Sequence, residues 1–297
     1  MLQLGASIAP APIYHIPRTY NAHPGSKYML PADEAEAERF ALQHQMFKRL
    51  FGGRLVYPPL TLSSGDEILD SGTGSSSWLL DCCDSIQGED ITYYAIDISS
   101  KLFPPINKRP RNTHHSVVSA THLPAQWSNK FTLVNQRLLI AALQIPEWEA
   151  TLKEIYRVLI PGGWVQLLEP SSQILSGPLT VKLTNLLNDL FTSRNMLFDI
   201  SGHLPQMMVN AGFRNLHAEI VDIPFGKWAG QDGVDGRDDF MGAFRGLKTP
   251  VLLAGGLGYV DSEAEFDGFF DALEKEWDTI PGSGLQGCLF YAQKPCV

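Results

Sequence analysis

Two aspartates and a pair of glycines stand at the ends of apolar runs in the first third of the chain. Asp70 ends one run and is followed closely by Gly72 and Gly74, and Asp97 ends a second run. Glycines let backbone N–H groups approach a ligand closely, and a helix start favours negative charge. A carboxylate at a strand end can accept both hydroxyls of a ribose. These residue types in this order predict a nucleoside-binding turn.

Three kinds of nucleotide site compete for this turn. A Walker loop requires Gly-Lys-Ser/Thr, which is absent here, and a nicotinamide or flavin site wants a third glycine where Ser77 stands. The Asp70 carboxylate would repel a pyrophosphate, whereas it suits the ammonium group of S-adenosylmethionine. Asp97 fits the ribose of NAD and of S-adenosylmethionine equally well, and a strand-end acid can also simply cap the next helix. The turn therefore favours S-adenosylmethionine as the ligand, but the turn alone does not distinguish it from NAD.

Strand and helix patterns alternate along the chain. Such alternation predicts a parallel sheet with right-handed crossover helices and a ligand site beyond the carboxyl ends of the strands. A two-strand antiparallel addition at the sheet end is also expected, and the Gly/Asp-rich segment 230–239 is expected to be a loop. The predicted strands are 67–70, 91–99, 114–120, 131–136, 164–170, 213–225 and 287–294, and the predicted helices are 31–50, 78–86, 147–159, 181–194 and 204–212.

Composition excludes several classes of protein. The 297 residues include 23 Lys and Arg against 32 Asp and Glu, a net charge of −9, which argues against a nucleic-acid binder with a basic face. Four cysteines without a CxxC pair predict neither a metal site nor a disulfide scaffold. No apolar run reaches about 18 residues, so no membrane span is expected. A cytoplasmic location is predicted, with nuclear entry left open by the short basic run 108–111; the oligomeric state is not readable.

Several segments carry a resemblance to a known family. The runs ILDSGTG, YYAIDIS, VNQRLLI and EIYRVLIPGGWVQLLEP resemble successive motifs of class I S-adenosylmethionine-dependent methyltransferases. Segments 28–55, 223–230, 244–258 and 290–295 resemble one branch, the fungal secondary-metabolism methyltransferases with the LaeA-type regulators and the gliotoxin-pathway N-methyltransferases. The resemblance covers about residues 20–295.

The resemblance implies an α/β fold: a Rossmann-like, seven-stranded class I methyltransferase sheet with helices on both faces. It implies an N-terminal arm, 1–27, before a single methyltransferase domain, 28–297. Within that domain we expect a lid helix segment, a cofactor-binding core and a substrate-side elaboration, at 28–60, 61–175 and 176–297. The glycine-rich segments 226–236 and 253–258 are expected to form either a flexible wall or lid at the acceptor, or merely loops.

The same resemblance implies a binding site for S-adenosylmethionine. The glycine turn would hold its methionine end, Asp97 its ribose, and residues after the second and third strands its adenine. Two side chains just past the fourth strand would lie where sulfonium and acceptor meet, and two from the lid would cover the cofactor. The implied residues are Tyr28, His44, Asp70, Gly72, Thr73, Gly74, Asp97, Ile98, Ala120, Thr121, Asn135 and Gln136.

Two positions depart from the family pattern. Ser76 replaces the third glycine of D-x-G-x-G-x-G, which predicts a loop slightly farther from the ligand. The third strand often ends in an acid that holds the adenine amine, but here Ser119 or Thr121 would have to do so. Two structural alternatives stay open: Arg137 pairs with a helix carboxylate, and Tyr28 anchors the arm to the core.

Methyl transfer is an in-line displacement in which alignment supplies most of the acceleration, so no base is obligatory. The candidate catalytic residues are His122, His44 and Gln136, with His203 and Glu169 as further candidate bases. Aromatic side chains at 164, 228, 240 and 244 are candidates for an acceptor pocket.

The predicted function is methyl transfer from S-adenosylmethionine to an O or N atom of a small-molecule secondary metabolite. Two alternatives stay open at this point. One is a cyclase on the same fold that uses the cofactor without transferring its methyl group. The other is a LaeA-like regulator that is not an enzyme and acts through protein partners.

Overall fold

One mixed sheet organises the chain, whose computed structural model describes residues 18–20, 27–86 and 90–296. The seven strands lie in the order β3-β2-β1-β4-β5-β7-β6. β1 to β5 are parallel, and β7 runs antiparallel to both of its neighbours. The predicted Rossmann-like sheet with an antiparallel addition is confirmed. Its strands are β1 Glu67–Ser71, β2 Thr92–Asp97, β3 Thr113–Val117, β4 Phe131–Arg137, β5 Leu159–Pro170, β6 Arg214–Pro224 and β7 Gly284–Gln293.

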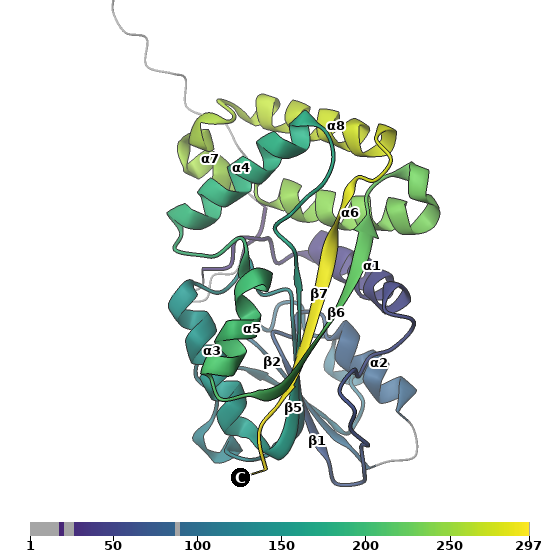
Figure 1. Cartoon of the computed structure of the whole chain (residues 1–297), viewed down its shortest axis with the longest axis vertical. Helices are drawn as coiled ribbons and strands as arrows, with labels where there is room; N and C mark the ends of the chain where they lie inside the picture. Colours follow the sequence, from purple (N-terminus) through teal and green to yellow (C-terminus); the bar gives the residue numbers. More distant parts are fainter. Residues whose placement is uncertain (1–17, 21–26, 87–89, 297) are drawn as a thin grey trace, which may run out of the picture.

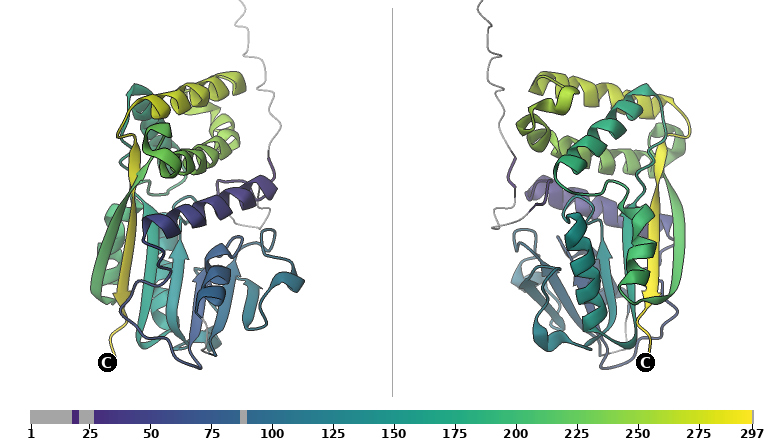
Figure 2. Two further views of the ribbon diagram at one scale, coloured as in Figure 1. Left: turned by 90° about the vertical axis from the view of Figure 1, so that its right-hand side faces the viewer. Right: turned by 60° about the vertical axis from the view of Figure 1, so that its left-hand side comes forward.

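The helices lie in two groups. α3 and α5 cover one face of the sheet and α2 the other, while α4, α6, α7 and α8 form a separate layer beyond the carboxyl ends of the parallel strands (Figure 1). α1 crosses between this upper layer and the sheet (Figure 2). The helices are α1 Glu34–Leu50, α2 Ser77–Ser85, α3 Ile145–Val158, α4 Pro178–Ser193, α5 Ile200–Asn210, α6 Gly230–Gly246, α7 Lys248–Leu253 and α8 Glu263–Thr279, and the short 3-10 turns are η1 Ile106–Lys108, η2 Ala125–Trp127, η3 Lys227–Ala229 and η4 Gly255–Gly258.

The expectation of a loop at 230–239 is wrong, because this segment is the first half of α6. Its glycines serve close packing rather than flexibility. A Cβ at Gly233 would lie 2.1 Å from the carbonyl oxygen of Gly226, and one at Gly236 would lie 2.3 Å from that of Pro224. Helix α6 thus presses its backbone against the end of β6, and tertiary packing outweighs the poor helix propensity of glycine.

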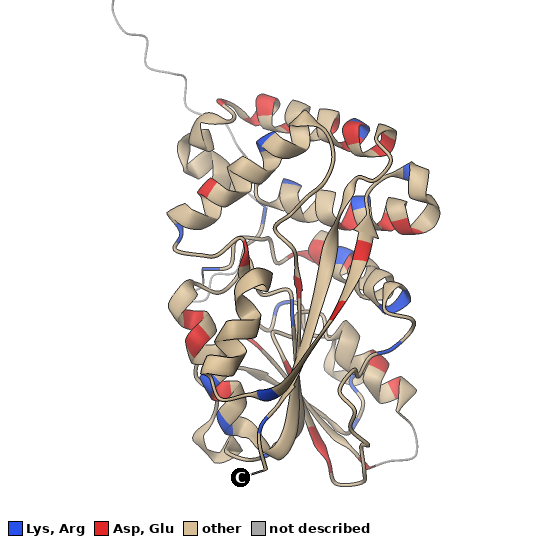
Figure 3. Cartoon of the chain, viewed as in Figure 1, with Lys and Arg blue, Asp and Glu red and all other residues tan. Residues whose placement is uncertain are grey.

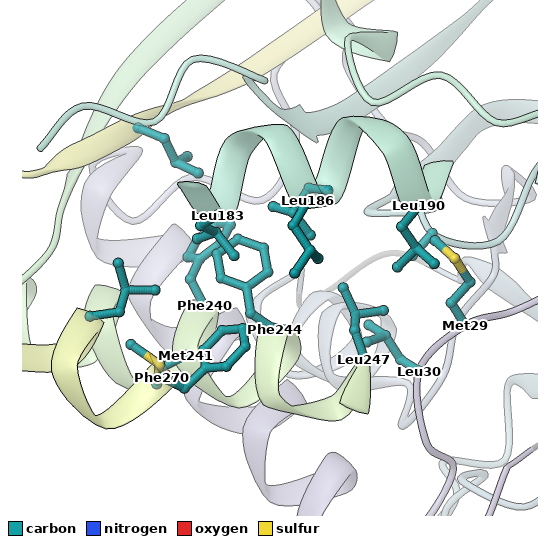
Figure 4. Packing of buried hydrophobic residues seen from close by; sticks show 14 of the residues in the cluster. Met29, Leu30, Leu183, Leu186, Leu190, Phe240, Met241, Phe244, Leu247 and Phe270 are labelled. Carbon is teal, nitrogen blue, oxygen red and sulfur yellow. The ribbon is translucent and has the colours of Figure 1, made fainter. Parts of the chain in front are cut away.

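The upper layer carries its own apolar core. Leu183, Leu186 and Leu190 of α4 face Phe240, Phe244 and Leu247 of α6 (Figure 4). The glycine-rich stretch 253–258 is a turn, as expected: η4 follows α7, and three of its glycines have positive φ angles.

Charged pairs join α1 to the upper layer. Arg39 of α1 donates to Asp239 of α6 at 2.7 Å, and Arg49 pairs with Asp235. Helices α1 and α6 lie against each other, and Figure 3 shows basic positions along α1 and acidic positions along α6.

Most of the predicted arm 1–27 lies outside the described residues. Tyr20, which is described, bridges Pro31, and its hydroxyl donates to the carbonyl of Gly246 at 2.9 Å. Among the described helices none has both the length and the apolar content needed to cross a bilayer.

Candidate functional site

A cavity of about 230 Å³ opens at the carboxyl edge of the parallel strands, below the upper layer. It has two halves of different chemistry. The polar half is made by the turns after β1, β2 and β3, through Asp70, Gly72, Thr73, Gly74, Ser75, Asp97, Ile98, Ser99, Val118, Ser119, Ala120 and Thr121. The apolar half is made by the lid segment, α4, α6 and nearby loops, through Tyr28, Leu30, Ile174, Leu187, Phe191, Phe198, Phe240, Ala243, Phe244, Leu247 and Leu285.

Asp97 ends β2 and is held by backbone donors. The Gly74 N–H donates to its Oδ2 at 3.0 Å, and the Ser99 N–H donates to its Oδ1 at 3.1 Å. Burial raises the pKa of Asp97, and these N–H groups oppose that rise. Each carboxylate oxygen can accept more than one hydrogen bond, so the fixed carboxylate can still accept a pair of ligand hydroxyls from the cavity.

Asp70 ends its apolar run just before the glycine turn and is 4% exposed. Its oxygens accept from the Thr73 hydroxyl at 2.5 Å and from the Asn135 amide at 2.7 Å. Burial raises the pKa of Asp70, which these two donors and Arg137 oppose. A buried carboxylate bonded to neutral donors favours a cationic ligand beside it.

The glycine turn is tightly enclosed. Gly72 and Gly74 have φ angles of +70° and +52°, and Cβ atoms there would lie 2.8 Å from Leu139 and 2.9 Å from Phe40. Ser76, the departure from the third glycine, also has a left-handed φ of 63°. Its buried hydroxyl hydrogen-bonds Nε2 of His115 at 3.0 Å, which helps to hold the strained turn.

Most of the predicted binding residues line the cavity, and three do not. Tyr28, the glycine turn, Asp97, Ile98, Ala120 and Thr121 line it, whereas His44, Asn135 and Gln136 lie outside the lining. The placement of Asn135 and Gln136 beyond the fourth strand is wrong, because β4 continues to Arg137. Both are therefore fixed inside the sheet, where Asn135 bonds Asp70 and Gln136 accepts from the Ser71 hydroxyl at 3.1 Å.

None of the three predicted catalytic residues, His122, His44 and Gln136, lines the cavity. His44 is buried behind it, with Nε2 at 2.8 Å from Asp81 and Nδ1 at 3.4 Å from Nη1 of Arg137. Burial, with Arg137 beside it, lowers the pKa of His44 to about 4. His44 is therefore neutral near pH 7 and contacts side chains of the protein rather than the cavity.

The two further candidate bases are also outside the lining. His203 bonds the carbonyl of Asp199 at 2.8 Å. Glu169 is buried and accepts from the N–H groups of Leu139 and Ile140 at 2.8 and 3.1 Å. Burial raises the pKa of Glu169 to about 8. Glu169 fixes the loop after β4, and this loop lines the cavity.

We expect stability to depend on His44 between pH 4 and 6.5. Its pKa is about 4 when folded and 6.5 in the unfolded chain, so only the unfolded chain gains this proton in that window. The free energy of unfolding therefore falls as pH drops from 6.5 toward 4. Asp81 and Lys48 lie beside this ring and Arg137 faces it.

Urea unfolding at pH 4.5 and pH 6.5 measures this dependence. The variant His44→Gln can donate to Asp81 and accept from Arg137, yet it does not titrate. Its loss of stability at the lower pH should be smaller than that of the wild type. An equal loss in both proteins would contradict the assignment.

The sequence analysis did not predict that side chains of α1 and Arg137 line the cavity. Arg39, Phe40 and Gln43 line the cavity from one helix face, a spacing of one and four positions that helix periodicity could have revealed. Arg137 also lines it, and the predicted pairing with a helix carboxylate is wrong, since no ion pair joins it to a described carboxylate.

Of the four aromatic residues predicted as candidates for the acceptor pocket, Phe240 and Phe244 line the apolar half of the cavity, as predicted. Trp164 instead packs against Tyr291 in the sheet core. The Trp228 ring is 39% exposed and donates to the carbonyl of Phe225.

Comparisons with known proteins agree with this geometry. Residues 42–218 match the family model described as a methyltransferase domain. The N-methyltransferase VerN of Clonostachys rogersoniana is 30% identical over 90% of this chain and 93% of its own. The N-methyltransferase SirN of Leptosphaeria maculans is 28% identical over 92% and 97% of the two chains.

A solved structure supports the fold. Phosphoethanolamine N-methyltransferase 2 of Haemonchus contortus, in complex with S-adenosyl-L-methionine, superposes with a TM-score of 0.53 and 14% identity. The match covers 88% of this chain and 56% of that one.

The polar half fits S-adenosylmethionine. The glycine turn borders the cavity with backbone alone, Asp97 presents fixed acceptors for a ribose, and Asp70 presents a carboxylate for an ammonium group. The chain belongs to the methyltransferase-domain family, within the methyltransferases of fungal secondary metabolism, and is an enzyme that transfers methyl from S-adenosylmethionine to a small-molecule acceptor.

Proposed function

We propose that this enzyme methylates a nitrogen atom of a neutral, largely apolar small molecule. The observation that carries the proposal is the apolar half of the cavity, whose side chains are almost all aliphatic or aromatic. A charged acceptor would lose its hydration against these side chains. The names of the relatives VerN and SirN, both N-methyltransferases, support nitrogen as the acceptor atom.

S-adenosylmethionine, when bound, supplies a methyl group activated on a sulfonium. The protein's own residues then have to orient the two partners and exclude water. No histidine is among the described residues that line the cavity. A neutral nitrogen has a lone pair and can attack without prior deprotonation, so this lining suits it better than a hydroxyl of ordinary pKa.

Phe244 tests the acceptor side, because it lines the apolar half from α6. We expect Phe244→Ala to raise the acceptor KM at least about tenfold, since it removes one aromatic wall of the pocket. The Kd for S-adenosylhomocysteine should stay within about twofold of the wild type. Phe269→Ala is the matched control, because Phe269 is equally buried in the same core and does not line the cavity.

The decisive experiment uses cofactor with an isotopically labelled methyl group. It is offered with neutral aromatic molecules that carry N–H, O–H or S–H as their only nucleophile. Label on nitrogen supports the proposal, and label only on oxygen or sulfur contradicts it. Consumption of an acceptor without label transfer would replace it with a cyclase reaction.

Location and macromolecular partners stay predictions from the sequence. The predicted location is the cytoplasm, with nuclear entry left open, and no contact with a membrane is predicted. The acidic composition argues against direct contact with nucleic acid.

A further inference from the structure

Arg137 is a half-buried residue whose guanidinium has few partners. It ends β4 and lies between the main cavity and a small hollow under α1. Burial lowers the pKa of Arg137. A guanidinium has five N–H donors, yet the hydrogen bond that the described residues offer it is the one to Nδ1 of His44, at 3.4 Å. No other hydrogen bond joins the Arg137 side chain to the described residues, and Arg137 lines the main cavity.

The neighbouring carboxylate does not neutralise Arg137. Asp70 is close enough to interact electrostatically, but no ion pair within 4.0 Å joins the two. Instead, the oxygens of Asp70 accept from Thr73 and Asn135. Buried charges normally pair with each other or with a ligand. The cavity therefore presents an acid and a base side by side, each without a charged partner in the described residues.

We propose that Arg137 binds the carboxylate of the methionine end of S-adenosylmethionine, next to an ammonium group held by Asp70. An α-amino acid carries both groups on one carbon, so it can bridge two opposite charges that do not touch. The planar guanidinium matches a carboxylate with parallel N–H donors. The charges balance as well: the cofactor carries two positive groups and one negative, and Asp70, Asp97 and Arg137 carry the reverse.

His44 gives this arrangement its orientation. Because its Nε2 lies 2.8 Å from the Asp81 carboxylate, that nitrogen carries the proton, and Nδ1 is left as an acceptor toward Arg137. Asp81 is itself held by Lys48 at 2.8 Å. Because the His44 ring is neutral, it can orient the Arg137 guanidinium through a hydrogen bond without neutralising its positive charge. His44 is thus a positioning residue that acts through Arg137.

Calorimetry with two ligands tests the proposal without any turnover. S-adenosylhomocysteine has both the ammonium and the carboxylate, whereas its decarboxylated analogue keeps only the ammonium. We expect the wild type to bind the first about 10- to 100-fold more tightly, as for hydrogen bonds between charged groups. Arg137→Gln should bind both ligands with similar affinity. Asp70→Asn is the matched control, since it should weaken both ligands and keep the ratio between them.

The affinity ratio decides the outcome. A ratio retained in Arg137→Gln, or a ratio below about threefold in the wild type, overturns the proposal. Thermal melting checks that the variants fold, and Arg137→Lys, which keeps the charge, should retain part of the preference. If Arg137→Gln does not fold, the wild type and Arg137→Lys still decide. None of these measurements involves an acceptor, so their failure is distinct from failure of nitrogen methylation.

Discussion

Asp97→Asn will weaken the binding of S-adenosylhomocysteine by at least about 100-fold, because hydrogen bonds to a charged acceptor contribute about 1.5–3 kcal/mol each. The carboxylate loses its charge toward the ribose hydroxyls. The new amide group must also face the N–H of Gly74 or of Ser99, where two donors now oppose each other. The anchored acceptor is thus lost as well as the charge.

Titration calorimetry of both proteins measures the effect. Asp90→Asn is a suitable control, because Asp90 is exposed and its side chain does not line the cavity. Affinity within about threefold of the wild type in Asp97→Asn would show that the ribose binds elsewhere.

The second prediction with a large expected effect concerns the stability of the fold. Gly236→Ala should lower the free energy of unfolding by about 3 kcal/mol, at the upper end of the usual cost of overpacking. The added Cβ would lie 2.3 Å from the carbonyl oxygen of Pro224, so either α6 or the end of β6 must move. A shift of α6 would also displace Phe240 and Phe244 from the acceptor pocket.

Gly268→Ala provides the matched control, since the same substitution is made in the middle of α8. A Cβ there meets no atom within 4 Å. Alanine favours a helix over glycine by about 1 kcal/mol, so this variant should be slightly more stable than the wild type. Urea unfolding of the three proteins gives the comparison, and equal stability of the two variants would rule out the packing explanation.

Local signals predicted the sheet and the cofactor turn. Alternating strand and helix patterns predict parallel strands with crossover helices, and the family resemblance implies the seven-stranded sheet. The sequence from Asp70 to Gly74 carries the need for positive φ in its glycines. The loop expected at 230–239 is a helix because contacts with Gly226 and Pro224, which no local pattern reveals, determine its glycines.

The site failed at the end of β4 for a related reason. A sequence pattern does not mark to the residue where a strand ends. Asn135 and Gln136 were expected just past the strand, at the reaction centre, although both belong to the strand and pair inside the sheet. The strand in fact runs one residue further, to Arg137, and brings the guanidinium to the cavity.

The two halves of the cavity come from different stretches of the chain. The turns after β1 to β3 build the polar half, while the upper layer, α4 and α6 above all, builds most of the apolar half. Acceptor choice and methyl-donor binding can therefore diverge separately. Grafting the upper-layer helices of one relative onto the sheet of another would exchange the substrate and keep the donor, provided that the close contact between α6 and β6 is transferred with them.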